Sequence, residues 1–236
     1  MSGSRIWAVV PAAGEGRRMQ ADRPKQYLPL LGKPILVRTV ERLCNHPQIC
    51  GVVVCVSPGD RYWDQVRPNL PRLRDTVIGG SQRMHSVCNG LKSLESDALA
   101  EDWVMVHDGV RPCLRDTDID ALISAIDDMS VVGAVLGLPI TDTVKQTNGS
   151  GKVVETVPRE SLWRAQTPQM FRLSALREAL EQALASDFKA TDESAAMERV
   201  GKCPIMIVGH GDNIKITTEQ DLRLAELYLQ QQMDEG

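Results

Sequence analysis

The feature that most constrains the fold of this chain is an alternation of apolar runs with amphipathic stretches. The runs are apolar on both faces, as in strands buried in a parallel sheet, and the stretches between them repeat apolar residues at helical spacing. Because such strand–helix–strand units place parallel strands in one sheet, the order predicts an α/β fold with a doubly wound, mostly parallel sheet. The expected strands are 6–10, 51–57, 76–78, 103–107, 131–138 and 205–208, and the expected helices are 34–45, 81–94, 116–126, 173–185, 191–200 and 217–229.

The first expected strand runs into a loop of small residues, Pro11–Gly16, which is followed by Arg17, Arg18 and Lys25. Backbone N–H groups in such a loop form a concave array that binds anions, and nearby cations offset the remaining charge. The loop lacks the Gly-Lys-Ser/Thr end of a Walker loop, and Met19 stands where a dinucleotide fingerprint needs its third glycine. Two interpretations remain: a phosphate-binding loop, or an ordinary turn beside a solvated basic patch.

A second strand end repeats this pattern. The strand at 76–78 runs into Gly79 and Gly80, and Ser81 is placed to cap the helix that follows. Ser86 lies in the first turns of that helix. Its hydroxyl is interpreted either as a ligand contact or as an ordinary group on the helix surface.

A carboxylate marks the next strand end. Asp108 follows the strand at 103–107, at the edge where α/β sheets bind ligands. With phosphates nearby it would be a natural Mg²⁺ ligand, and the alternative is a turn cap before Gly109. His107 is interpreted as structural, because Mg²⁺ prefers oxygen. Lys215 enters late in the chain beside another acid, Asp212.

Residues 143–157 depart from the α/β pattern. Two polar, β-branched segments flank the turn sequence 148–151, which predicts a β-hairpin. Because the hairpin is too polar for the core, we expect a protruding arm, about residues 139–160, that makes a homodimer contact. A flexible surface loop is the alternative. The whole chain, residues 1–236, is expected to form a single domain that carries this arm.

Composition narrows the possible partners. A net charge of −4 does not favour a general nucleic-acid binder, and no apolar run approaches the length of a membrane span. The N-terminus shows no signal-peptide core. Six scattered cysteines without a CxxC pair fit reduced thiols, so a cytoplasmic location is expected.

Taken together, these motifs resemble the 2-C-methyl-D-erythritol 4-phosphate cytidylyltransferases of the non-mevalonate isoprenoid pathway. The resemblance covers nearly the whole chain, and its most specific strings are 24–27, Pro-Lys-Gln-Tyr, and 212–217, Asp-Asn-Ile-Lys-Ile-Thr. Gly109-Val110 departs from the usual Ala-Ala, and Gln82 stands where Glu is usual before Arg83, which places a local salt bridge in question. The other matching stretches are 11–14, 16–19, 57–60, 79–80, 86–87, 106–108, 111–113, 141–143, 162–163, 166–169 and 191–193.

The resemblance implies a nucleotidyltransferase, with a Rossmann-like fold, that joins CTP to methylerythritol phosphate in the presence of Mg²⁺ and releases pyrophosphate. It implies catalytic roles for Arg18, Lys25, Arg159 and Lys215, and CTP contacts from Pro11, Ala12, Ala13, Gly14, Gly80, Ser86 and Gly109. It implies that Asp108, Thr143, Arg159, Thr191 and Lys215 bind the second substrate, with Asp108 also holding the metal. Thr143 and Arg159 would reach the neighbouring subunit's site. Two alternatives are a ribitol 5-phosphate cytidylyltransferase of the same fold and a nucleotide-binding module without turnover.

Overall fold

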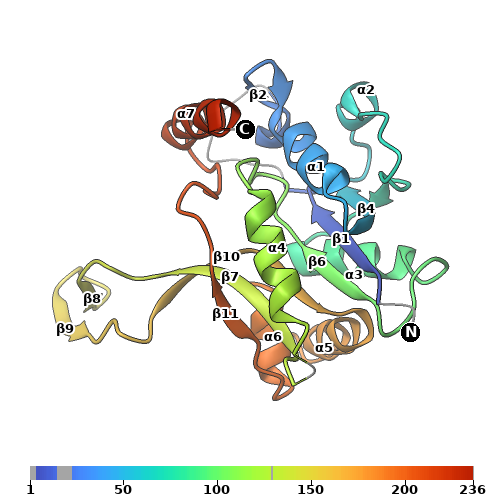
Figure 1. Ribbon diagram of the computed structural model, residues 1–236. Helices are drawn as coiled ribbons and strands as arrows, with labels where there is room; N and C mark the ends of the chain where they lie inside the picture. Colours follow the sequence, from blue (N-terminus) through green and yellow to red (C-terminus); the bar gives the residue numbers. More distant parts are fainter. Residues whose placement is uncertain (1–3, 15–22, 129, 236) are drawn as a thin grey trace.

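A seven-stranded sheet forms the centre of the protein (Figure 1). The structure is a computed structural model that describes residues 4–14, 23–128 and 130–235. The strand order across the sheet is β11-β7-β10-β6-β1-β4-β5. In chain order the strands are β1 (Ile6–Pro11), β4 (Ile49–Val56), β5 (Val77–Ile78), β6 (Trp103–Val106), β7 (Gly133–Pro139), β10 (Trp163–Arg172) and β11 (Ile205–Val208).

The sheet is mostly parallel, as the sequence predicts. β1 pairs in parallel with both β4 and β6, and β11 pairs in parallel with β7. The exception is β10, which runs antiparallel between β6 and β7 and was not expected from the sequence. Its pattern is hidden because Pro168, which follows a cis peptide bond, interrupts it, and the register shifts between Ala165 and Gln169. Proline inside a run of residues normally argues against a central strand.

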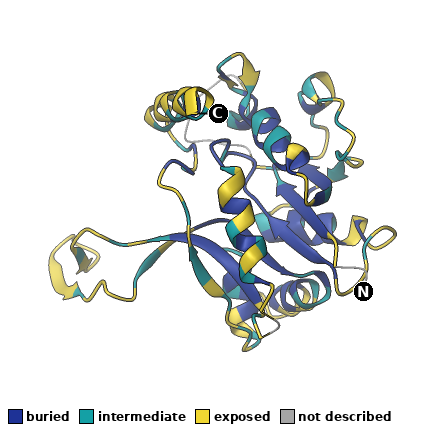
Figure 2. Ribbon diagram, viewed as in Figure 1, coloured by how far each residue is buried: buried dark blue, intermediate teal, exposed yellow. Residues whose placement is uncertain are grey.

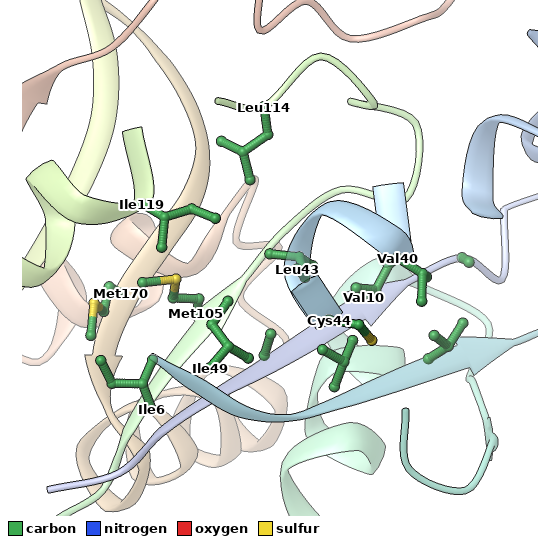
Figure 3. Packing of buried hydrophobic residues seen from close by; sticks show 14 of the residues in the cluster. Ile6, Val10, Val40, Leu43, Cys44, Ile49, Met105, Leu114, Ile119 and Met170 are labelled. Carbon is green, nitrogen blue, oxygen red and sulfur yellow. The ribbon is translucent and has the colours of Figure 1, made fainter. Parts of the chain in front are cut away.

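Helices cover both faces of the sheet (Figure 1). α1 (Ile35–Asn45) and α4 (Asp116–Ala125) bury side chains such as Leu43 and Ile119 against one face, as Figure 3 shows. α3 (Arg83–Ser93), α5 (Leu173–Ala185) and α6 (Glu193–Arg199) pack on the other face around Trp7 and Phe171. Because alternate residues of each strand face opposite helix layers, the strands are apolar on both sides.

A smaller cluster attaches the C-terminal helix. α7 (Glu219–Glu235) buries Ala225 and Leu229 against Leu30 and Val110. Leu30 lies in a short hairpin of β2 (Pro29–Leu30) and β3 (Lys33–Pro34), which follows the 3-10 helix η2 (Lys25–Tyr27). This packing links the end of the chain to the segment that carries Lys25. A four-residue helix, α2 (Trp63–Val66), buries Trp63 in the same cluster as Leu43 of α1.

The predicted arm extends away from the body of the molecule (Figures 1 and 2). It consists of the antiparallel strands β8 (Val144–Thr147) and β9 (Val153–Val157), which pair only with each other in the described part of the chain. Gly151 has a φ of +78°, which suits glycine in the connecting turn. Val153 and Val154 are more than 60% exposed on it. The arm leaves the sheet after β7 and returns into β10, at the edge where β1 and β6 end.

The starts of the helices agree with the sequence only in part. Gln82, not Ser81, precedes α3, and its side chain makes no cap hydrogen bond. α4 begins at Asp116, as expected. α6 begins at Glu193, two residues after the start of the expected helix 191–200, and Asp192 caps it by accepting a hydrogen bond from the backbone of Ala195. None of the helices in the described residues has the length and apolar character needed to cross a membrane.

Candidate active site

A pocket of about 200 Å³ opens where β1, β5 and β6 end. These strands are parallel, so their carboxyl ends meet at one edge of the sheet, and β1 is the point where the strand order reverses. Many of the residues singled out in the sequence lie around it. The predicted residues that line the pocket are Pro11, Ala12, Ala13, Gly14, Lys25, Gly80, Ser86, Asp108, Gly109 and Lys215.

The backbone groups of the loop after β1 form hydrogen bonds with neighbouring segments, which hold the loop in place. The N–H of Ala12 donates to the carbonyl of Cys55, 2.7 Å away, so the sheet already uses this donor, while Ala12 itself lines the pocket and its contact with the nucleotide stays a prediction. Gln26 Nε2 donates to the carbonyl of Ala12 at 2.8 Å, and Ser57 Oγ donates to that of Ala13 at 3.0 Å. Arg18, predicted to be catalytic, lies outside the described residues.

The turn between β5 and α3 brings Ser86 inward. Ser86 is only 1% exposed, so its hydroxyl does not lie on the helix surface. It accepts a hydrogen bond from the N–H of Gly80 at 3.1 Å and donates to the carbonyl of Gln82 at 3.3 Å. A side chain on Gly80 would place its Cβ 2.3 Å from the Cβ of His85, so this close turn requires glycine. By accepting the hydrogen bond from Gly80, Ser86 fixes this turn as part of the pocket wall.

Asp108 stands at the centre of a cluster of cations. Its Oδ1 accepts from Arg83 Nε at 2.9 Å, and its Oδ2 lies 2.8 Å from Lys215 Nζ and 3.7 Å from Arg111 Nε. Burial alone would raise the pKa of the Asp108 carboxyl, but the charges of Arg83, Lys215 and Arg111 outweigh burial and hold its pKa well below the usual value. The carboxylate therefore stays ionised and orients the positive groups around it.

The backbone of Asp108 is fixed by a chain of hydrogen bonds. Its N–H donates to Thr167 Oγ1 at 3.0 Å, and that oxygen lies 3.0 Å from His107 Nδ1. His107 Nε2 lies 3.0 Å from the carbonyl of Arg111, to which it must donate. Burial lowers the pKa of His107 to about 4, so the ring is neutral at neutral pH. This arrangement confirms the structural interpretation of His107.

Lys25 and Lys215 reach the pocket from segments far apart in the chain. Lys25 Nζ donates to the carbonyl of Ile216 at 3.1 Å, and the N–H of Ile216 donates to the carbonyl of Val110 at 2.9 Å. Arg111 Nη1 also donates to the carbonyl of Asn213 at 2.6 Å. The segment after β11 is thus tied to the loop that carries Asp108, which brings both lysines to one cavity.

Three predicted residues lie away from this pocket. Thr143 and Arg159 are exposed at the base of the arm, where Arg159 Nη1 donates to the carbonyl of Thr141. Thr191 is exposed just before α6. The expectation that Thr143 and Arg159 serve a neighbouring subunit's site stays a prediction.

The sequence interpretation missed the partners of Arg83. In addition to Asp108, this guanidinium binds both oxygens of Glu193. Arg83 therefore has carboxylate partners on other elements, although Gln82 stands where Glu is usual. One signal was present: Arg83 is the first residue of α3, where the helix macrodipole disfavours a cation, so an arginine there needs carboxylate partners.

Within the described residues, no group of three or more His, Cys, Asp or Glu side chains is arranged to hold a metal ion. The chain does offer one ionised carboxylate, Asp108, inside a cation-rich pocket. Mg²⁺ commonly binds through one or two carboxylates, phosphate oxygens of the substrate and water. The donor set therefore fits a magnesium ion that arrives with a nucleotide, and does not fit a site built from protein side chains alone.

Comparisons with known proteins agree along the whole chain. A family model described as IspD: 2-C-methyl-D-erythritol 4-phosphate cytidylyltransferase matches residues 6–231. The enzyme of that name from Hahella chejuensis is 45% identical over 235 residues, which are 100% of this chain and 97% of its own. The Aeromonas hydrophila enzyme of the same name is 49% identical over 228 residues, covering 96% of this chain and 90% of its own.

Solved structures agree as well. The Francisella tularensis 2-C-methyl-D-erythritol 4-phosphate cytidylyltransferase superposes with a TM-score of 0.83 at 33% identity, over 95% of this chain and 100% of that one. A crystal structure of 4-diphosphocytidyl-2C-methyl-D-erythritol synthase gives a TM-score of 0.83 at 32% identity, over 96% and 100% of the two chains.

Proposed function

Because the chain belongs to the 2-C-methyl-D-erythritol 4-phosphate cytidylyltransferase family, it transfers CMP from CTP to 2-C-methyl-D-erythritol 4-phosphate with release of pyrophosphate, and we propose that the pocket at the ends of β1, β5 and β6 is where it does so. The observation that carries this assignment is the convergence of Lys25, Asp108 and Lys215 on one cavity. Nucleotidyl transfer of this kind requires that two anionic substrates are positioned for in-line attack and that positive groups offset their negative charge.

In this proposal the nucleotide binds along the loop after β1. The N–H groups of Ala13 and Gly14 are the remaining backbone donors for its phosphates, and Arg18 and Lys25 stabilise the negative charge that develops on them. Gly80, Ser86, Gly109 and Pro11 also line the pocket and would contact the nucleotide.

The second substrate would occupy the side of the pocket near Asp108. Lys215 lies 2.8 Å from Asp108 and can turn from this carboxylate to a phosphate oxygen. Asp108 would accept hydrogen bonds from the substrate hydroxyls while its Oδ1 remains bound to Arg83. Thr143, Arg159 and Thr191 would complete the contacts, with Thr143 and Arg159 supplied by the arm.

Mg²⁺ is the proposed metal, and Asp108 would hold it together with phosphate oxygens of CTP. When bound, it would offset part of the charge on the triphosphate. The chain's own cations share that task, because Lys25 and Lys215 line the same pocket.

A homodimer joined through the arm is also proposed. The arm exposes two adjacent valines, Val153 and Val154, although β8 and β9 pair only with each other in the described residues. An isolated two-stranded hairpin is marginally stable in water, so a partner surface would stabilise it.

A cytoplasmic location accords with the free cysteines, of which Cys44, Cys55, Cys88 and Cys113 are buried.

A coupled assay tests the substrates and the metal together. Purified protein should release pyrophosphate from CTP only when methylerythritol phosphate and Mg²⁺ are both present, and EDTA should reduce the rate to background. Ribitol 5-phosphate serves as the matched control for the polyol. Turnover that survives EDTA would remove Mg²⁺ from the proposal, and faster release with ribitol 5-phosphate would favour the other cytidylyltransferase.

Arg159→Ala should raise KM for methylerythritol phosphate by roughly 10-fold or more, because a charge-assisted hydrogen bond to its phosphate is lost. KM for CTP should change much less, since the nucleotide side of the pocket is built from other elements. Steady-state kinetics with each substrate varied in turn measures this difference. Lys152→Ala, which removes an exposed cation from the same arm, is the control. Equal changes in both KM values would contradict the assignment.

Subunit exchange tests whether Arg159 acts across a dimer. Inactive or weakened Lys25→Ala and Arg159→Ala proteins are mixed and allowed to exchange subunits. If the arm serves the neighbouring site, a mixed dimer regains one complete site, with Lys25 from one subunit and Arg159 from the other. Activity equal to the sum of the separate proteins, despite exchange seen by mass spectrometry, would show that Arg159 acts within its own chain.

A further inference from the structure

We propose that Glu193 is a positioning residue for the transferase reaction, acting through Arg83 to fix the carboxylate of Asp108. The inference rests on the proposed role of Asp108 in binding metal and substrate. It assigns a function to α6, a helix on the face of the sheet opposite α1 and α4, whose first residue is Glu193.

Arg83 joins the two carboxylates through separate nitrogens. Its Nη1 and Nη2 donate to the two oxygens of Glu193 at 2.6 and 3.0 Å, while its Nε donates to Asp108 Oδ1 at 2.9 Å. A guanidinium is planar and rigid, so fixing one edge on Glu193 also fixes the direction of the Nε–H bond. The position of Glu193 therefore sets where Asp108 Oδ1 is held.

Burial shows that Glu193 acts on Arg83 and not on the substrate. The side chain of Glu193 is 1% exposed, whereas that of Arg83 is 29% exposed and lines the pocket. A carboxylate buried to this degree is costly unless it is paired, and here both of its oxygens are used by one guanidinium. The pair also keeps Arg83 from turning fully toward Asp108 or toward a bound anion.

The start of α6 is itself fixed to the sheet. Gln169 on β10 donates through Nε2 to Asp192 Oδ2 at 2.9 Å and accepts through Oε1 from the N–H of Ser194 at 2.9 Å. Asp192 and Ser194 flank Glu193 in sequence, so both neighbours of this residue are anchored by one side chain. Glu193 is thus held on a rigid element, as positioning of a reactive carboxylate requires.

With Arg83 fixed on Oδ1, the other oxygen of Asp108 faces Lys215 at 2.8 Å. Oδ1 of Asp108 is thus used to fix the orientation of the carboxylate, and Oδ2 is left for Lys215 and for the metal or substrate that binds during the reaction. Without Glu193, the guanidinium could rotate and compete with Lys215 for Oδ2. The expected consequence is a carboxylate in the wrong orientation, which lowers turnover more than ground-state binding.

Glu193→Gln and Glu193→Asp test the proposal. Gln keeps the shape and removes the charge, whereas Asp keeps the charge and shortens the side chain. Glu193→Gln should lower kcat/KM by roughly 10- to 100-fold, the scale for losing an orienting partner, with most of the loss in kcat. Glu193→Asp should retain more activity than Glu193→Gln. Glu181→Gln, an exposed position on α5, is the control.

A double-mutant cycle with Asp108→Asn separates positioning from a structural role. The rate constant kcat for pyrophosphate release with Mg²⁺ is measured in the wild type, both single variants and the double variant. If Glu193 acts through Asp108, Glu193→Gln should lower kcat in the wild-type background and change it by less than about 2-fold in the Asp108→Asn background. Equal losses in both backgrounds, or Glu193→Gln being more active than Glu193→Asp, would overturn the proposal. Normal turnover of Asp108→Asn alone would instead reject the proposed role of Asp108.

Discussion

Asp108→Asn is expected to lower kcat by roughly 10²- to 10³-fold, the scale for removing one element of an electrostatic clamp on a transferring phosphoryl group. Asparagine keeps the shape of the side chain but loses the charge that orders three cations. Arg83, Lys215 and Arg111 all lie within 3.7 Å of the carboxylate oxygens. Their positive charges would then repel one another without a shared anion, and the position of Lys215 would no longer be defined.

The measurement is pyrophosphate release at saturating CTP and sugar phosphate, with Asp127→Asn as a control that makes the same charge change at an exposed position. Thermal unfolding of both variants should accompany it. We expect Asp108→Asn to lose about 1–3 kcal/mol of stability, because hydrogen bonds to a charged group are lost. Arg83 keeps its bond to Glu193, which limits the loss. A folded Asp108→Asn protein with near-normal kcat would remove this carboxylate from the reaction.

The parts of the fold that were predictable are those in which local pattern and tertiary environment agree. Strands such as β4 are apolar on both faces because helix layers cover both faces of the sheet, and α5 begins and ends where its periodicity does. β10 could not be predicted, because Pro168 and the shifted register remove the usual strand pattern. Its place between β6 and β7 depends on pairing with strands distant in sequence, which no local pattern encodes.

The candidate site likewise contains residues that could be predicted from the sequence and contacts that could not. Residues at strand ends, such as Asp108, are predictable because parallel strands bring their carboxyl ends to one edge. The Arg83–Glu193 pair joins positions 110 residues apart, so its geometry follows only from how α3 and α6 pack on the sheet. The occupied N–H of Ala12 was unpredictable for a related reason: its acceptor, Cys55, is set by the register of β1 on β4.

Lys25→Ala is expected to lower kcat by roughly 10²-fold or more, while KM for CTP changes far less. Lys25 begins η2, which is held from three sides. Gln26 donates to the carbonyl of Ala12, Tyr27 donates to Asp60 Oδ2 at 2.7 Å, and Lys25 itself donates to the carbonyl of Ile216. A cation fixed in this way requires little reorganisation when charge develops on the triphosphate, so its contribution falls mainly on the transition state.

The comparison of kcat with KM decides between this role and simple attraction of CTP. If Lys25 contributed only uniform binding of the triphosphate, Lys25→Ala would raise KM for CTP and leave kcat unchanged. That result would contradict stabilisation of the transition state. Lys25→Arg adds a second criterion, because it restores the charge on a bulkier planar group, and we expect only partial recovery of kcat. Lys92→Ala, at an exposed position in the last turn of α3, removes an equal charge and should leave both constants unchanged. A loss shared by Lys92→Ala would indicate that net charge, and not the placement of Lys25 by η2, determines the rate.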